Sequence, residues 1–309
     1  MENLTAWDIA AITTKLLTYG GSFLAAGSVF FLFANGERAD PVRKALHLLI
    51  TVAVLVGILG SILQFGVQSG RLMDEGLSGM MDPDMVELVS GAPLGTSVFI
   101  RTLGLVILLS IWLPSPINSP LAAIGGVVVA ASFSFVGHGT GDPRWLLGSL
   151  VSFHLIAVSF WIGALYPLHR MAGGSTNIVE AGHLSHRFGQ QAAIVVGLLV
   201  AVGVFLTWWI VGSISALLGS QYGWTLILKL LLVASLLGLA AANKFRFVPA
   251  MLKGEPSAAN HLRQSIRWET FAIAIILLTT AVLTTVTSLP RAENSDQIGS
   301  GMENMDHGN

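Results

Sequence analysis

The sequence contains no cysteine in its 309 residues. Disulfides, thiolate metal sites and CxxC redox motifs are therefore excluded, and any metal must be held by histidine, methionine, carboxylate or backbone oxygen. Charged residues are also scarce, at 11%, whereas a soluble domain carries about 25%. Hydrophobic residues make up 53% and the mean hydropathy is +0.73. This composition is typical of a membrane protein.

Other features that would point to particular functions are missing as well. The net charge of −1 gives no basis for a nucleic-acid partner. No phosphate-binding loop, nucleophile with a paired base or carboxylate pair is found, so we expect a protein that is not an enzyme. Any transport would then be passive or coupled to an ion gradient. The first eight residues, MENLTAWD, lack a basic region, so we expect no cleavable signal peptide.

Eight apolar segments are long enough to cross a membrane as helices. They cover residues 9–34, 43–66, 97–113, 119–137, 144–166, 188–213, 223–243 and 268–289. The predicted fold class is therefore an all-α polytopic membrane bundle of about eight transmembrane helices over residues 1–290, followed by a flexible tail, 291–309.

The basic residues predict how this bundle is oriented. Ten Lys and Arg fall in loops on one side, and four, Arg71, Arg101, Arg144 and Arg291, fall on the other. Cytoplasmic loops carry the excess of positive charge, so both termini are expected outside the cytoplasm.

Two histidines lie in the stretch SFSFVGHGTGDPRWLLGSLVSFHLIAVSFWIG, residues 132–163. His138 ends the fourth span between two glycines, which let the backbone bend toward a ligand but equally mark an ordinary turn. His154 lies about ten residues into the fifth span, about 15 Å from its outer end. An ionisable group at that depth usually faces the bundle interior. It is either a metal ligand or a neutral histidine bonded to a neighbouring helix. Trp161 shares its helix face and is a secondary candidate for lining the same seam.

Methionine is concentrated outside the predicted spans. Beyond Met1, six of the eight methionines lie on the predicted outer side: Met73, Met80, Met81 and Met85 in the second outer loop, and Met302 and Met305 beside His307 in the tail. Methionines that fill a core would be scattered through the spans. Thioethers and imidazoles without thiols favour copper, Cu(I) in particular. The alternative is a small amphipathic element on the membrane surface, followed by a mixed polar tail.

A second pair of histidines follows the fifth span. His183 and His186 are three residues apart in EAGHLSHRFG, and such a pair on a helix can clasp a metal. The segment is basic and on the predicted cytoplasmic side, where histidines are usually only solvated. We keep both as secondary metal candidates.

The second half of the chain resembles the bacterial copper resistance protein D family. The matching stretches are GHGTGDPRW, SFHLIAVSFWIGALYPL, GWTLILKLLLVASLLGLAAANKFRFVPAM and LRQSIRWETFAIAIILLTTAVLTT, within residues 125–290. The first half is similar only in consisting of apolar spans. The resemblance implies copper transport or delivery at the cytoplasmic (inner) membrane, often beside a soluble periplasmic copper-binding protein. The family's pattern carries over to His138 and His154 in this chain, which makes them the first candidates for copper ligands.

These observations predict a copper-handling membrane protein. Copper would be collected by the outer groups, pass His138 at the rim and reach His154 within the membrane; the outer groups are Met80, Met81, Met85, Met302, Met305 and His307. Two alternatives remain open. A b-type haem protein that passes electrons needs two histidines at similar depth, which only His47 and His154 would supply. A non-catalytic assembly subunit of a membrane complex would have no substrate of its own.

Overall fold

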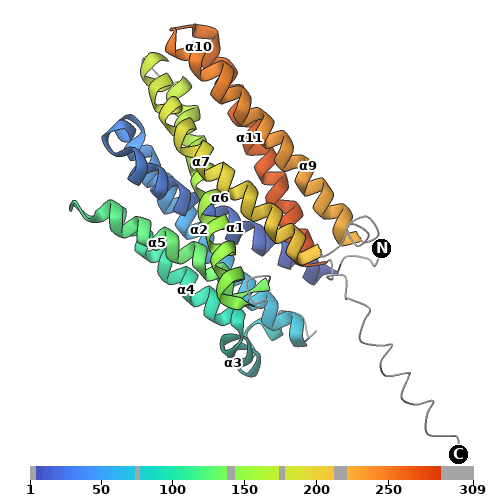
Figure 1. Ribbon diagram of the computed structural model, residues 1–309. Helices are drawn as coiled ribbons and strands as arrows, with labels where there is room; N and C mark the ends of the chain where they lie inside the picture. Colours follow the sequence, from blue (N-terminus) through green and yellow to red (C-terminus); the bar gives the residue numbers. More distant parts are fainter. Residues whose placement is uncertain (1–4, 74–76, 138–142, 174–177, 212–220, 287–309) are drawn as a thin grey trace, which may run out of the picture.

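The computed structural model describes residues 5–73, 77–137, 143–173, 178–211 and 221–286 (Figure 1). The long helices are α1 (Ala6–Asn35), α2 (Asp40–Met73), α4 (Pro93–Leu108), α5 (Asn118–Ser132), α6 (Arg144–Gly173), α7 (Ile178–Val211), α9 (Gln221–Ala242) and α11 (Pro256–Leu283). The short elements are α3 (Pro83–Gly91), α10 (Val248–Leu252), the 3-10 turns η1 (Gly36–Ala39), η2 (Ser78–Met80), η3 (Leu109–Trp112) and η4 (Phe133–Phe135), and the π-helix η6 (Asn243–Phe247). These residues include no strand, which confirms the all-α class.

Eight of these helices cross the membrane. Seven stretches of the described chain are long and apolar enough to span a bilayer, and the first of them, Ala6–Leu72, is 67 residues long. A single crossing needs about 20 residues. The long stretch holds both α1 and α2, which reverse at η1 and pack along each other. It therefore crosses twice, and the predicted bundle is confirmed.

Helix α1 is central to the packing. It contacts α2, α5, α6 and α11 (Figure 1). Glycine permits the closest of these approaches: a Cβ on Gly27 would lie 1.8 Å from the carbonyl oxygen of Ser159, and a Cβ on Gly21 would lie 2.4 Å from the nitrogen of Gly57. Helices associate in lipid through such close backbone packing, because lipid tails are as apolar as the side chains they replace.

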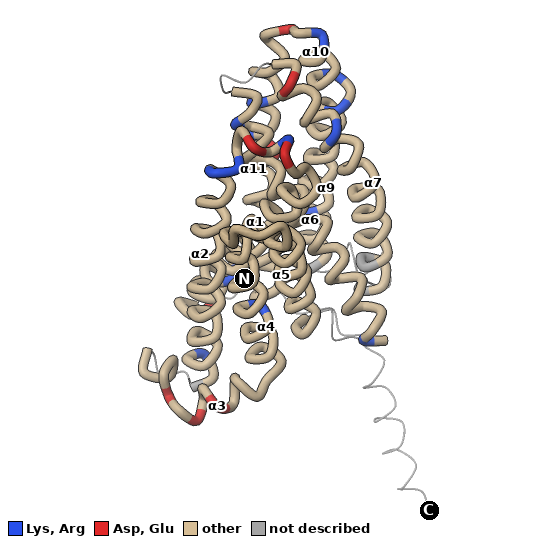
Figure 2. Tube along the Cα trace, turned by 90° about the vertical axis from the view of Figure 1, so that its left-hand side faces the viewer, with Lys and Arg blue, Asp and Glu red and all other residues tan. Residues whose placement is uncertain are grey.

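Basic side chains gather toward one end of the bundle (Figure 2). This end, which we call the basic end, comprises the turn between α1 and α2, the ends of α6 and α7 that follow each other in the chain, and the connection from α9 to α11. An arginine joins two of these parts, because Arg187 of α7 donates to the carbonyl oxygen of Ala34 at 3.2 Å. The residues predicted for the inner side lie in these elements or in the adjoining turns of α2 and α11, for example Arg38 in η1 and Lys244 in η6; the orientation in the membrane stays a prediction.

The prediction for Arg101 was wrong. It was counted with the outer loops, yet it is only 1% exposed, inside the bundle on α4. Its guanidinium hydrogen-bonds the hydroxyls of Ser97 at 2.6 Å, Ser132 at 3.3 Å and Ser61 at 3.5 Å, and it lies 3.9 Å from the centre of the Phe133 ring. Hydroxyls from three helix segments and one aromatic face thus replace the water that this cation would otherwise need.

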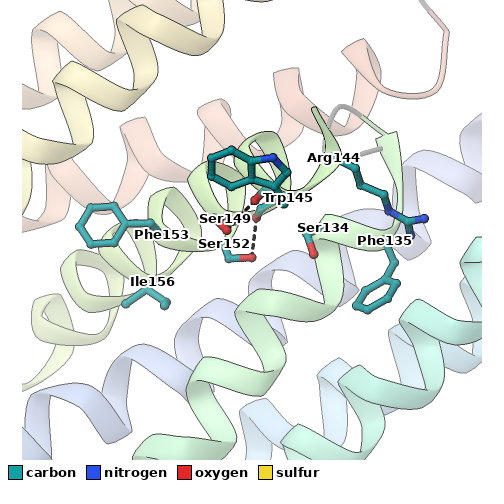
Figure 3. A pocket seen from close by; sticks show the side chains of 9 residues that line it. Ser134, Phe135, Arg144, Trp145, Ser149, Ser152, Phe153 and Ile156 are labelled. Carbon is teal, nitrogen blue, oxygen red and sulfur yellow. Dashed lines mark hydrogen bonds between the residues drawn. The ribbon is translucent and has the colours of Figure 1, made fainter. Parts of the chain in front are cut away.

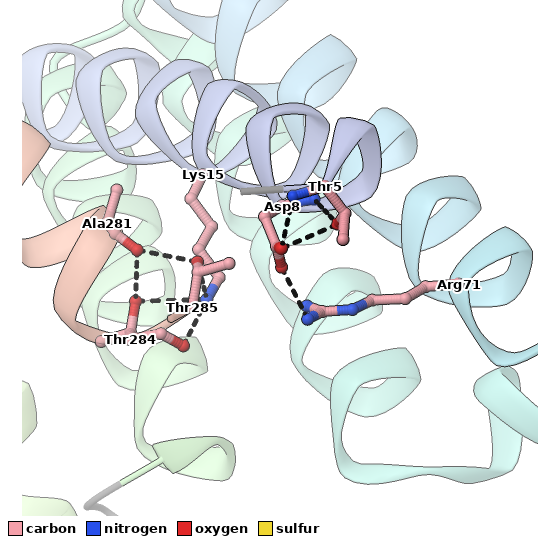
Figure 4. A network of polar contacts seen from close by, with 7 residues as sticks. All are labelled: Thr5, Asp8, Lys15, Arg71, Ala281, Thr284 and Thr285. Carbon is pink, nitrogen blue, oxygen red and sulfur yellow. Dashed lines mark hydrogen bonds and ion pairs between the residues drawn. The ribbon is translucent and has the colours of Figure 1, made fainter. Parts of the chain in front are cut away.

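The end of the bundle opposite the basic end is closed by a polar network between distant parts of the chain (Figure 4). Asp8 completes a capping box with Thr5 and forms an ion pair with Arg71 of α2 at 2.8 Å. Lys15 donates to the carbonyl oxygen of Thr284 at 2.7 Å and to the hydroxyl of Thr285 at 2.8 Å. The first turns of α1 are thereby tied to both α2 and the end of α11.

Candidate functional site

His154 faces the interior of the bundle. Helix α6 begins at Arg144, so the imidazole lies about 15 Å along the helix, as predicted. Its Cε1 is 3.9 Å from the position of a Cβ on Gly203 of α7, and Lys229 of α9 is close enough to interact with it electrostatically. Nδ1 is buried and has no hydrogen-bond partner among the described residues. Since none of the described residues bonds to it, the Nδ1 atom is available to a ligand.

A second polar cluster lies two turns further along the same face of α6. Trp161 donates its indole N–H to Oε2 of Glu269 on α11 at 3.1 Å. Asn243, the first residue of η6, donates its amide N–H to the other carboxylate oxygen, Oε1. Glu269 is 3% exposed and forms no ion pair within the described ranges. Both oxygens of a buried carboxylate are therefore held by neutral donors.

This cluster borders a cavity of about 260 Å³ between α6, α7, α9 and α11, which we call the Glu269 cavity. Its walls are mostly apolar, for example Leu165 and Phe188, while its other polar groups include Ser185 and Lys244. Oδ1 of Asn243 is buried beside it without a hydrogen-bond partner in the described part of the chain. A water molecule occupies about 30 Å³ in the liquid, so the cavity can hold several waters or a partly hydrated ion.

The sequence did not predict the Glu269 cavity. The eighth span was drawn from residue 268, which put Glu269 at its end, whereas α11 begins at Pro256 and carries Glu269 near its middle. Proline at the first helical position is the signal that locates this start, because its missing N–H costs nothing there. Trp161 was a secondary candidate; its one polar atom is an N–H donor, which it gives to Glu269, so in this structure it positions the carboxylate.

A different face of α6 borders an open cleft of about 530 Å³ (Figure 3). Its walls come from η4 and the first half of α6: Ser134, Phe135, Arg144, Trp145, Gly148, Ser149, Ser152, Phe153 and Ile156. The hydroxyls of Ser149 and Ser152 donate to carbonyl oxygens of their own helix, at 2.6 and 2.8 Å. His154 is not part of this wall, and the described lining offers a copper ion neither imidazole nor thioether. His138 falls outside the described residues.

Comparison with known proteins gives two matches along the chain. The model for the N-terminal domain of copper resistance protein D-like proteins matches residues 5–149, and the copper resistance protein D model matches residues 182–283. The chain belongs to the copper resistance protein D family. The relationship thus extends over the first half, where the sequence showed us only a general likeness. No solved structure matches.

Two curated relatives can be compared with this chain over most of its length. Copper resistance protein D of Pseudomonas syringae pv. tomato is 29% identical, over 87% of this chain and 94% of that protein. Copper transport protein CutJ of Bacillus subtilis (strain 168) is 24% identical over 89% of this chain but 52% of its own length, so this chain spans about half of CutJ. Glu269 and Asn243 lie inside the copper resistance protein D match, while His154 lies between the two matched parts.

The outer methionines of this family member are not equivalent to one another. Met80 packs against α2, where its Cε lies 2.9 Å from the position of a Cβ on Gly66. Met81 is 86% exposed. Met85 lies in the first turn of α3, which Asp82 caps by accepting the N–H of Met85 at 3.1 Å. Met80 and α3 thus form a small packed element, and Met81 is the most exposed of Met80, Met81 and Met85. Met302, Met305 and His307 lie outside the described residues.

The remaining histidines lie apart from His154 in the described part of the chain. His183 and His186 are exposed on α7, and no group of three His, Asp or Glu side chains there could hold a metal ion. His47 and His154 contact different surroundings: the His47 ring packs edge-on against Trp112 at 5.0 Å, while His154 faces α7 and α9. This arrangement gives the haem alternative no support.

Proposed function

We propose that the protein transports copper across the cytoplasmic membrane, with His154 as the ligand inside the bilayer. The observation that carries the proposal is the buried Nδ1 atom of His154, which faces a helix seam without a partner in the described residues. Leaving such an atom unpaired costs about 1–3 kcal/mol, and a bound ion would remove that cost. Family membership and the names of its relatives, copper resistance protein D and copper transport protein CutJ, support copper as the ion.

The imidazole of His154 is a suitable ligand for a copper ion that must bind and then leave again. A neutral imidazole coordinates Cu(I) without adding a buried negative charge, and a single nitrogen holds the ion weakly enough to release it. Lys229 opposes binding, because an ammonium beside the imidazole repels a metal cation. Copper would therefore occupy the site when Lys229 has turned its head group away.

Delivery from the outer side would use the exposed thioether groups. Met81 and Met85 on the described surface, together with Met302, Met305 and His307 of the tail, supply soft donors that favour Cu(I). In this proposal they receive the ion, directly or from a soluble periplasmic copper-binding protein, and His138 passes it to His154. The tail, residues 291–309, acts as a collecting segment attached to the bundle.

The test is Cu(I) uptake into vesicles that contain the purified full-length protein. Replacement of His154 by alanine should lower the initial rate at least about tenfold, which corresponds to the loss of 1.4 kcal/mol or more of binding, while the amount of inserted protein is unchanged. His186→Ala is the matched control, because this histidine is exposed on α7, and it should keep the wild-type rate. A His154→Ala variant that transports as well as wild type would refute the role of His154.

A further inference from the structure

Glu269 is a buried ionisable group that the copper path does not require. It is 3% exposed in a membrane-spanning helix, and its hydrogen bonds come from two neutral donors, Trp161 and Asn243. A carboxylate inside a bilayer without a counter-charge is costly, and such groups usually mark ion pathways or proton relays. The cavity beside it leaves room for a positive partner.

We propose that Glu269 and Oδ1 of Asn243 form a binding site for a hard monovalent cation, a proton or a sodium ion, whose exchange drives copper movement. The driving role rests on the proposed copper transport, whereas the binding itself does not. Oδ1 of Asn243 is buried and unpartnered in the described chain, so the site offers a carboxylate and a second oxygen ligand. η6 begins at Asn243, and π-helical turns frequently occur at functional sites.

The donor atoms separate this site from the copper ligand. Its ligands are oxygens, which suit hard cations, whereas Cu(I) prefers thioether and imidazole. His154 is seven residues before Trp161, the α6 residue bonded to Glu269, and this is about 10 Å along the axis of α6. A divalent ion such as calcium takes six to eight oxygens, several of them from carboxylates, and the described walls of the cavity contain one carboxylate. A monovalent hard ion is the occupant that these ligands fit.

The charged groups around the cavity leave Glu269 without a fixed counter-ion. From α7 the described wall contributes the hydroxyl of Ser185, and from α6 the indole of Trp161. The segment after α9 contributes Lys244, whose ammonium lies 5.7 Å from the centre of the Phe245 ring and makes no ion pair with Glu269 in the described structure. The carboxylate is therefore accessible to an exchangeable cation from the cavity.

Binding can be measured without copper. Infrared difference spectra of the purified full-length protein, recorded between acidic and neutral pH, should contain the C=O band of a protonated carboxyl group, and Glu269→Gln should lack that band. Sodium chloride should remove the band if the site also takes sodium. Glu180→Gln is the matched control, because Glu180 is an exposed residue of α7, and it should leave the buried-carboxyl band in place. A wild-type spectrum with neither a Glu269 band nor a sodium-dependent change would overturn the binding site.

Coupling is then measured as copper uptake into vesicles under an imposed pH gradient or an imposed sodium gradient. For wild type and Glu180→Gln, one of the two gradients should change the rate of copper uptake about tenfold. The gradient that has this effect identifies the ion. Glu269→Gln should transport at the same rate with and without it. Should Glu269→Gln prove unstable, Asn243→Ala removes the second oxygen ligand and should weaken the response. Copper transport that ignores both gradients, or a Glu269→Gln variant that still responds, overturns coupling and leaves copper transport intact. Absence of copper uptake in wild type instead contradicts the proposed function.

Discussion

A single methyl group added where α1 crosses α6 tests how the bundle is held together. Gly27 of α1 meets Ser159 and Gly163 of α6 so closely that a Cβ on Gly27 would lie 1.8 Å from the Ser159 carbonyl oxygen and 2.9 Å from the Gly163 nitrogen. Ordinary van der Waals contact begins near 3.4 Å. Gly27→Ala must therefore move the two backbones apart by about 1.6 Å at this point, because neither atom belongs to a flexible side chain.

The expected cost follows from two opposing effects. Overpacking a well-packed interior costs about 1–3 kcal/mol, and occasionally more when backbone has to move. Alanine is a better helix former than glycine by about 1 kcal/mol, which offsets part of the cost. We expect Gly27→Ala to lower the free energy of unfolding by about 2 kcal/mol. Because α6 carries His154 and Trp161, the same shift should also lower copper transport.

Gly20→Ala is the matched control, since Gly20 lies on the same helix and a Cβ there would meet nothing within 4 Å. It should be neutral or stabilising by up to about 1 kcal/mol. Unfolding in detergent, followed by loss of helical circular dichroism with increasing denaturant, compares the two variants. Equal midpoints for Gly27→Ala and Gly20→Ala would show that the α1–α6 crossing is looser than the structure indicates, and the argument would fail.

Two further pairs of variants separate buried from surface interactions by the same unfolding measurement. Arg101→Gln should destabilise the protein by several kcal/mol, because each hydrogen bond to a charged group contributes about 1.5–3 kcal/mol. Arg71→Gln breaks a surface ion pair worth at most about 1 kcal/mol. Equal effects of the two substitutions would contradict the stabilising role of the serine hydroxyls around Arg101. Met80→Ala should cost about 2 kcal/mol because its side chain packs on α2, while Met81→Ala should change stability by less than about 0.5 kcal/mol and weaken Cu(I) binding to the full-length protein. Unchanged Cu(I) binding by Met81→Ala would remove that residue from the collecting surface.

The sequence predicted the eight crossings because each is an apolar run of sufficient length, and a bilayer leaves few other ways to bury such a run. Two charged residues lie further inside their helices than the apolar runs indicated, for a common reason. Arg101 and Glu269 stand near the beginnings of apolar runs, so they were assigned to span ends. The helices begin earlier, at Pro93 and Pro256, which puts both residues well inside. A helix continues past the hydrocarbon-like part of its sequence, and its start is marked by proline rather than by hydropathy.

The partners of the buried polar groups were beyond sequence reasoning. Trp161 and Glu269 are 108 residues apart, and nothing in either local pattern states that their helices meet. The prediction that His154 faces the interior used only the high cost of exposing an imidazole to lipid. Identifying Gly203 and Lys229 as its neighbours requires the packing of α6, α7 and α9.

Helix α6 connects the two proposed sites physically. His154 and Trp161 are seven residues apart on one face, and Trp161 is bonded to Glu269, so a rotation or tilt of α6 that changes access to the imidazole must also strain or break the bond to the carboxylate. An ion that binds Glu269 more tightly in one position of α6 would shift the helix toward that position, by no more than its difference in affinity for the two positions. Soft nitrogen at one depth and hard oxygen at another would keep copper and the second cation at separate sites. The proposed coupling would therefore depend on the intact Trp161–Glu269 bond rather than on competition of two ions for the same ligands.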